Sequence, residues 1–275
     1  MEKHIVGVDV GGTKMYMLTE MDGKYIERIV PTGIQCTKLY IKEALNQFIS
    51  ELPFKVDAVG MALPGLIKNE DTLELSDVVP DLNGVTVDYF SEGQFEVKFI
   101  NDVKAATLGE GAYYKQAHTV VVIMVGTGIA AGVIEQGRIL QGANGFSGEI
   151  GCAHIPYKEG VESLDNLSSG AAILKKAGCL SDELRKLLEN GDEKAKHIIE
   201  EAGYYFGIGL GLMIQFYNPD VIVVGGGTST YPGYMEVAKE TAKRYTLPQL
   251  YESCLITEPR DIKRIVALGA IEVIS

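Results

Sequence analysis

The stretch that decides the fold is Gly7-Val8-Asp9-Val10-Gly11-Gly12-Thr13-Lys14, in which a buried strand runs into a glycine turn directly after a carboxylate. The apolar run of residues 5–10 ends at this turn, and a second run follows at 15–19. A third segment, 24–30, comes after an Asp-Gly turn. Short apolar runs separated by glycine turns predict an antiparallel meander of three strands.

The same order of elements returns later in the chain. Residues 119–125 are expected to form a strand, Gly126-Thr127-Gly128 a turn, and 129–135 and 138–141 the next two strands. The unit at 5–30 therefore recurs at 119–141, as weak internal symmetry without a fixed period. Two such units facing each other would form a cleft with a glycine turn on each wall, and clefts are the usual place for small-molecule sites.

The remaining elements are predicted from apolar periodicity and from glycine and proline stops. The predicted helices cover 39–52, 102–111, 171–177, 181–189, 192–217, 234–244 and 267–274, and the further strands cover 58–63, 95–100 and 221–224.

Length and composition describe a globular protein of two domains. A chain of 275 residues is long for one core, and 46% hydrophobic with 23% charged residues argues against disorder. The net charge of −12 argues against general binding to nucleic acid or anionic membranes. No apolar run reaches the roughly 20 residues that a membrane helix needs. A phosphate-bearing substrate is therefore expected to be captured locally, by backbone amides and Mg²⁺.

The cysteines and the start of the chain favour a cytoplasmic location. The four cysteines are widely spaced and form no C-x-x-C pair, which fits a reducing compartment without a disulfide framework. Met1-Glu2-Lys3-His4 leads straight into a strand and leaves no room for a signal peptide.

The glycine turns have the chemistry of phosphate loops. Glycine reaches positive φ freely and lets the backbone approach an anion, so amides of Gly11-Gly12-Thr13 and the Thr13 hydroxyl can hold a phosphate. Asp9 is suited to hold Mg²⁺ through water. Gly126-Thr127-Gly128 offers the same chemistry, and Gly225-Gly226-Gly227 is a third loop after a strand. Neither of the first two is a Walker loop. Alone, each could be a plain hairpin turn.

Taken in order, these segments resemble the ROK family (repressors, open reading frames and kinases) of the sugar kinase, Hsp70 and actin superfamily. The matching segments cover nearly the whole chain and are 7–14, Gly60-Met61-Ala62-Leu63-Pro64-Gly65, Asn101-Asp102, Gly126-Thr127-Gly128-Ile129, Gly148-Glu149-Ile150-Gly151, and 218–220 through 225–227. The resemblance implies an α/β fold of two actin-like (ribonuclease H-like) domains, each with a mixed β-sheet, and an interdomain cleft that binds ATP. The small domain would comprise 1–115 plus 259–275, and the large domain 116–258. It also suggests a homodimer.

The resemblance assigns roles to individual residues. Asp102 would be the catalytic base, and the other sugar-binding positions would be Gly65, Asn101, Glu149, His154 and Asp165. The cofactor-binding residues would be Asp9, Gly11, Gly12, Thr13, Lys14, Gly126, Thr127, Gly128 and, beside the adenosine, Gly225, Gly226 and Gly227. Asp102 could instead be only the N-cap of its helix.

The segment after Gly151 departs from the family pattern. Many members have a histidine directly after the Gly-Glu-x-Gly motif, whereas this chain has Cys152. His154 takes the family position if Cys152-Ala153 is a two-residue insertion, and it is otherwise an ordinary histidine. Asp165 stands where the family has a second sugar-binding glutamate. The family's cysteine cluster is missing between 156 and 170, so no structural zinc is expected.

Three functions remain open at this point. The first is a hexose kinase that makes a 6-phosphate with ATP and Mg²⁺, with glucose the leading candidate and fructose, mannose or N-acetylmannosamine as alternatives. The second is a sugar-responsive repressor, which is disfavoured because such members carry an N-terminal winged helix and this chain is acidic. The third is a non-catalytic sugar-binding regulator.

Overall fold

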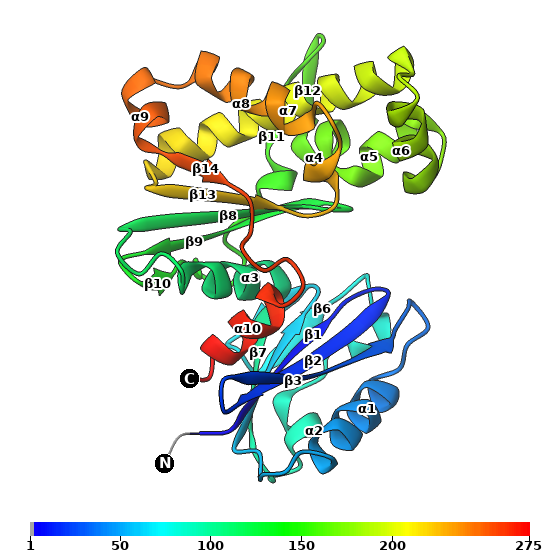
Figure 1. Ribbon diagram of the computed structural model, residues 1–275, viewed down its shortest axis with the longest axis vertical. Helices are drawn as coiled ribbons and strands as arrows, with labels where there is room; N and C mark the ends of the chain where they lie inside the picture. The colour runs from blue at the N-terminus through cyan, green and yellow to red at the C-terminus, as the bar shows by residue number, and fades with distance from the viewer. Residues whose placement is uncertain (1–2) are drawn as a thin grey trace. The chain divides into compact units, whose positions relative to one another are not determined.

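The computed structural model describes residues 3–275 (Figure 1). It contains two compact units, the first made of Met1–Lys115, Ile139–Ser147 and Arg260–Ser275 and the second of Gln116–Arg138 and Gly148–Pro259. Met1 and Glu2, on which the signal-peptide expectation depends, lie outside the described residues. Each unit has a five-stranded mixed sheet with helices, so the predicted α/β fold class is confirmed.

The sheet of the first unit begins with the predicted meander. Its strand order is β3-β2-β1-β4-β7, with the bounds β1 (Ile5–Val10), β2 (Lys14–Met21), β3 (Lys24–Pro31), β4 (Ala58–Leu63) and β7 (Glu96–Asn101). The first three strands pair antiparallel, and β4 pairs parallel with both β1 and β7. The carboxyl ends of three neighbouring parallel strands therefore meet at one edge of this sheet.

Side-chain alternation along β1 separates the two faces of this sheet. Val6, Val8 and Val10 are buried in a core that includes α1 (Lys38–Ser50), a helix capped by Thr37. Gly7 and Asp9 point to the opposite face, on which α10 (Ile265–Glu272) packs. Asp9 thus reaches the edge of the sheet on the α10 face.

Glycines allow α10 to approach the sheet and α3 (Asp102–Gly111) closely (Figure 1). A Cβ on Gly7 would lie 2.1 Å from the Ala267 carbonyl oxygen, and one on Gly60 would lie 1.7 Å from that of Ala270. A Cβ on Gly269 would lie 1.6 Å from the Ala105 carbonyl oxygen. Backbone-to-backbone contact of this kind excludes any side chain at these positions.

The second unit repeats the sheet topology of the first. Its strand order is β10-β9-β8-β13-β14, with the bounds β8 (Thr119–Val125), β9 (Ile129–Glu135), β10 (Arg138–Ile139), β13 (Val221–Gly225) and β14 (Leu255–Thr257). Again an antiparallel pair is followed by two parallel pairs, so the predicted duplication is confirmed. Two helices, α7 (Glu193–Tyr217) and α8 (Tyr234–Tyr245), pack together and share a core with this sheet (Figure 1).

The other helices and strands are short. They are β5 (Leu66–Lys68), β6 (Thr72–Leu75), α2 (Val87–Ser91), β11 (His154–Tyr157), β12 (Gly160–Ser163), α4 (Leu164–Ser168), α5 (Gly170–Ala177), α6 (Ser181–Glu189) and α9 (Pro248–Ser253). Within residues 3–275, no helix has the length and apolar character required to cross a membrane.

Candidate functional site

The first glycine loop is a tight connection between β1 and β2. The Gly11 N–H donates to the Lys14 carbonyl oxygen at 2.9 Å, and the Thr32 hydroxyl donates to the Gly11 carbonyl oxygen at 2.6 Å. Thr13 and Lys14 are exposed. The loop is thus held from both sides, with its polar tip facing outward.

The expectation that the glycines of the first two loops adopt positive φ was wrong. Gly11 and Gly12 are absent from the residues with positive φ, and so are Gly126 and Gly128. Space restricts Gly12 instead, because its Cβ would lie 2.9 Å from Val78 Cγ1. In the third loop, by contrast, Gly226 has φ +96°, and its Cβ would lie 2.3 Å from the Val125 carbonyl oxygen.

Two acidic residues share the edge of the first sheet. Burial and the nearby charge of Asp102 raise the pKa of Asp9 to about 7, and the charge of Lys14 opposes this shift. Asp9 lies at the end of β1 and Asp102 directly follows β7, with β4 between these strands. The parallel strand ends therefore bring the predicted metal-holding and base residues into electrostatic contact.

Asn101, and not Asp102, caps α3. The Asn101 Oδ1 accepts hydrogen bonds from the N–H groups of Val103 (3.0 Å) and Lys104 (3.3 Å), which is the usual N-cap arrangement. The alternative that Asp102 serves as the cap was therefore wrong. Asp102 is the first residue of the helix, and its Oδ1 accepts from the Val103 N–H at 2.9 Å.

Asn101 also contacts the predicted sugar-binding backbone at Gly65. Its Nδ2 donates to the Gly65 carbonyl oxygen at 3.1 Å. Gly65 has φ +126°, and a Cβ there would lie 2.0 Å from the Leu75 carbonyl oxygen, so only glycine fits. The structure thus brings two of the predicted site residues into contact, with Asn101 linking the end of β7 to the turn after β4.

In the second unit, the second and third glycine loops meet. The Gly126 carbonyl oxygen accepts from the Gly170 N–H at 2.8 Å and from the Thr228 hydroxyl at 3.1 Å. The Ala171 N–H donates to the Thr127 carbonyl oxygen at 3.2 Å. Thr228 directly follows the third loop, and Gly170 begins α5. The loops predicted to hold phosphate and adenosine are therefore neighbours.

A cavity of about 320 Å³ lies beside these two loops. Its lining includes Ser181, Arg185 and Tyr231, which the motifs of the sequence did not predict. The Arg185 guanidinium lies 4.6 Å from the centre of the Tyr231 ring and donates to the Gly227 carbonyl oxygen at 3.2 Å. A planar cation stacked on a ring at a glycine loop offers flat, polar surfaces to a heterocyclic ligand.

Asp165 supports the second loop. Its Oδ1 accepts from the Ile129 N–H at 2.7 Å, and its carboxylate lies against Gly128 and Gly151. A Cβ on Gly151 would lie 2.4 Å from Asp165 Oδ1. Burial raises the pKa of Asp165, while the bond from Ile129 lowers it. Asp165 therefore joins the second glycine loop to the Gly-Glu-x-Gly motif.

Glu149 and His154 are both exposed on this part of the second unit. Gly148, before Glu149, has φ +98°, and a Cβ there would lie 1.8 Å from the Ala131 carbonyl oxygen of β9. The backbone that carries Glu149 is thus fixed to the sheet. His154 opens β11, and its Nδ1 lies 3.1 Å from the Cys152 carbonyl oxygen. Whether His154 takes the family histidine's role stays a prediction.

The donor set at the first sheet suits Mg²⁺ held through water. Asp9 and Asp102 supply hard carboxylate oxygens, and because burial and the charge of Asp102 both raise the pKa of Asp9, a bound cation would favour the charged form of this acid. Over the described part of the chain, no group of three or more His, Cys, Asp or Glu side chains could hold a metal ion directly. Phosphate oxygens and water would have to complete the coordination of such an ion.

The model of the ROK family matches residues 5–274. The chain belongs to the ROK family. The resemblance found in the ordered motifs is thereby confirmed.

Relatives of this ROK family protein include sugar kinases. It is 24% identical over 277 residues to an N-acetyl-D-glucosamine kinase of Escherichia coli O6:H1, an alignment that covers 88% of this chain and 90% of that one. It is 27% identical to the ROK hexokinase of Thermus thermophilus, with a TM-score of 0.84 and coverage of 98% and 96%. The fold also matches a ROK family glucokinase of Streptomyces griseus, solved with glucose and AMPPNP, at 20% identity, a TM-score of 0.79 and coverage of 98% of both chains.

Proposed function

We propose that this protein is an ATP-dependent hexose kinase that phosphorylates the 6-hydroxyl, with glucose as the leading substrate. The observation that carries the proposal is the electrostatic pair of Asp9 and Asp102 at the sheet edge, with Asn101 and Gly65 joined beside it. Phosphoryl transfer to a hydroxyl needs one carboxylate for the proton and a second that holds the metal. The relatives that are sugar kinases support the same activity.

We assign ATP to the three glycine loops. The Gly11 N–H is used within the turn, so in the first loop phosphate contacts would come from Gly12, Thr13 and Lys14. In the second loop Thr127 and Gly128 are exposed and would face the phosphates. The cavity beside the second and third loops would hold the adenosine, with Arg185 and Tyr231 along its wall.

We assign the proton transfer to Asp102. Its carboxylate would accept the proton of the hexose hydroxyl as that oxygen bonds to the γ-phosphorus, while the bond to the β–γ bridging oxygen breaks and ADP leaves. Asn101 would fix the start of α3 and orient the hydroxyl through the Gly65 turn. Mg²⁺, held through water by Asp9, would offset the phosphate charge.

We assign the rest of the sugar contacts to Glu149, His154 and Asp165. A carboxylate accepts hydrogen bonds from two hydroxyls at once, which suits the vicinal hydroxyls of a hexose. The bond from the Ile129 N–H to Asp165 also ties this set to the second loop. Fructose, mannose and N-acetylmannosamine are the alternative substrates. We also propose that the protein is a homodimer and that it is cytoplasmic.

The test is an ADP-release assay across a panel of hexoses and N-acetylhexosamines, run on the parent protein and on Asp102→Asn. The variant is expected to lose about 10²–10⁴-fold in turnover, the usual contribution of a general base. Asp88→Asn, which alters an exposed acid in the first turn of α2, is the control and should retain parent turnover. Calorimetric sugar binding without ADP release by the parent protein would favour the regulator instead.

A further inference from the structure

Residues 140–147 form a loop that closes on itself within the first unit. The Ser147 hydroxyl donates to the Leu140 carbonyl oxygen, and the Ser147 N–H donates to the Gln141 carbonyl oxygen at 3.3 Å. Gly142 and Gly145 have positive φ, +74° and +88°. We call this segment the 140–147 loop. Its conformation is specified by its own hydrogen bonds and glycines.

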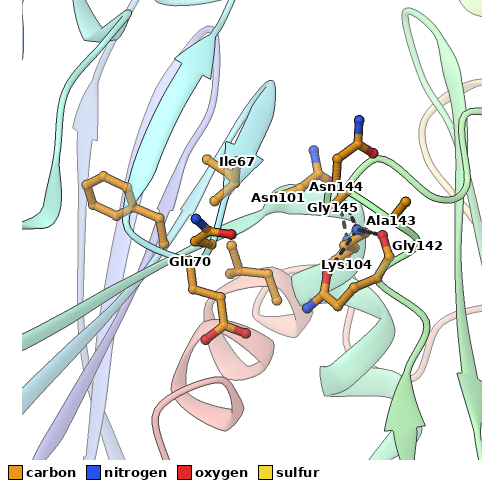
Figure 2. A pocket seen from close by; sticks show the side chains of 12 residues that line it. Ile67, Glu70, Asn101, Lys104, Gly142, Ala143, Asn144 and Gly145 are labelled. Carbon is orange, nitrogen blue, oxygen red and sulfur yellow. Dashed lines mark hydrogen bonds between the residues drawn. The ribbon is translucent and has the colours of Figure 1, made fainter.

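The loop is seated on two elements of the first unit. At one side Gly145 lies against β5, where a Cβ would come within 2.7 Å of the Ile67 carbonyl oxygen. At the other side is Lys104 of α3, whose side chain donates to the loop (Figure 2). A cavity of about 190 Å³ lies between these contacts, lined among others by Asn101 and Asn144.

Lys104 is buried, with only 4% of its surface exposed. Its Nζ donates to the Gln141 Oε1 at 3.0 Å, to the Gln141 carbonyl oxygen at 3.5 Å and to the Gly145 carbonyl oxygen. Burial of an ammonium group is unfavourable unless hydrogen bonds replace its water. All three of these acceptors come from the 140–147 loop. The loop therefore stabilises the buried ammonium group, and the ammonium group stabilises the conformation of the loop.

Lys104 also connects this loop to the predicted sugar contacts. Its backbone N–H is one of the two donors to Asn101 Oδ1, so one residue holds the cap with its main chain and the loop with its side chain.

We propose that Lys104 is a positioning residue for hexose binding: its ammonium group fixes the 140–147 loop against the start of α3, where the loop and Asn101 line the same cavity, and thereby holds that cavity in the shape that receives the hexose. The inference rests on the proposed kinase function. It requires that hexose affinity, more than ATP affinity, depends on these three hydrogen bonds.

The first experiment compares Lys104→Met with Lys98→Met. Lys98, on β7, donates to the Val273 carbonyl oxygen and pairs with Glu70, neither of which belongs to the loop, so it is a matched control. We expect Lys104→Met to raise the KM for hexose about tenfold or more and to change the KM for ATP less than about twofold. Lys98→Met should leave both constants near parent values. A hexose KM within about twofold of the parent in folded Lys104→Met would overturn the proposal.

A second pair of variants keeps the test decisive if Lys104→Met does not fold. Gln141→Glu retains a side-chain acceptor for Lys104 and should behave like the parent protein. Gln141→Leu has a similar volume without the acceptor and should raise the hexose KM by about threefold or more. Equal hexose KM values in these two variants would count against the role of Lys104.

Hydrogen exchange separates this proposal from the kinase assignment. Amides of residues 141–147 should exchange faster in Lys104→Met and Gln141→Leu than in the parent protein or Lys98→Met. If the parent protein phosphorylates no hexose, the kinase proposal fails, and calorimetric glucose affinity replaces KM as the readout. Faster loop exchange with unchanged hexose affinity would also overturn the positioning role.

Discussion

At the scale of single residues, Asn101 illustrates how one side chain serves both stability and the candidate site. Its Oδ1 caps α3, and its Nδ2 donates to the Gly65 carbonyl oxygen. An amide is required for both tasks, because a carboxylate can cap a helix but has no N–H to donate.

Two substitutions at this position should separate the tasks. Asn101→Asp retains the cap and loses the bond to Gly65, so we expect a higher hexose KM with nearly parent stability. Asn101→Ala loses both and should also lower the free energy of unfolding by about 1 kcal/mol, the usual effect of removing a cap. Urea denaturation and hexose titrations give the two quantities. Equal unfolding free energies for these variants would contradict the capping role.

Glu110 is a buried acid in α3 that should make stability depend on pH. One carboxylate oxygen accepts from the Arg260 N–H at 2.8 Å, and the other has no hydrogen-bond partner among the described residues. Burial raises the pKa of Glu110 above its usual value of 4.5. The folded state therefore holds this proton more tightly than the unfolded state does. Its contribution to stability is full below pH 4.5 and is lost as pH rises through the folded pKa.

Glu110→Gln removes this titration and keeps an oxygen for the Arg260 N–H. The Tm of the variant minus the Tm of the parent protein should therefore increase as the pH is raised from 5 to 8. Thermal denaturation across this range measures it, with Glu159→Gln, an exposed glutamate, as control. A difference that is constant with pH, or one that moves toward the parent protein, would contradict the raised pKa.

At the scale of elements, the packing of α10 depends on glycines that face backbone atoms. Gly269→Ala places a methyl group where the Ala105 carbonyl oxygen lies 1.6 Å away, so α10 and α3 must separate. We expect a loss of about 3 kcal/mol in the free energy of unfolding, at the upper end for overpacking. Urea denaturation measures the loss. Gly33→Ala, at a glycine with open space around it, should be nearly neutral.

The longer elements could be predicted from the sequence. The strand 119–125 and the helix 181–189 have the predicted bounds, because periodicity and turn residues mark them clearly. The β5–β6 hairpin, the β11–β12 hairpin and α9 were missed. Their strands and helix have three to six residues, too few for a period to show.

The residues of the candidate site also include some that could be predicted from the sequence and some that could not. Asp9, Asn101 and Asp102 could be found because they follow strands at the edge where parallel strands end. Arg185 could not, because only the tertiary fold brings α6 to Gly227, and Tyr231 stands out only once Arg185 is seen over its ring. Lys104 was missed because a lysine in a helix is normally solvated, and here the 140–147 loop covers it.

At the scale of the whole molecule, metal should be required for turnover and not for folding. Removal of divalent ions with EDTA should abolish ADP release, since Mg²⁺ accompanies ATP in such reactions, and added Mg²⁺ should restore it. The Tm should change by less than about 1 °C, because no structural zinc is expected in this protein. Removal of a structural zinc would lower the free energy of unfolding directly. A fall in Tm with EDTA that zinc reverses would contradict this expectation.

The position of α10 in the sequence also affects how the protein can be made. The first unit needs the segment from Arg260 onward, yet the ribosome synthesises residues 116–259 before that segment. At 5–20 residues per second this interval lasts roughly 7–30 seconds. During translation Gly7 and Gly60 are without the helix that covers them, so the second unit, although later in the chain, is the one able to complete its fold first. Nascent chains halted before Arg260 should thus be open to chaperones and proteases mainly in their N-terminal part.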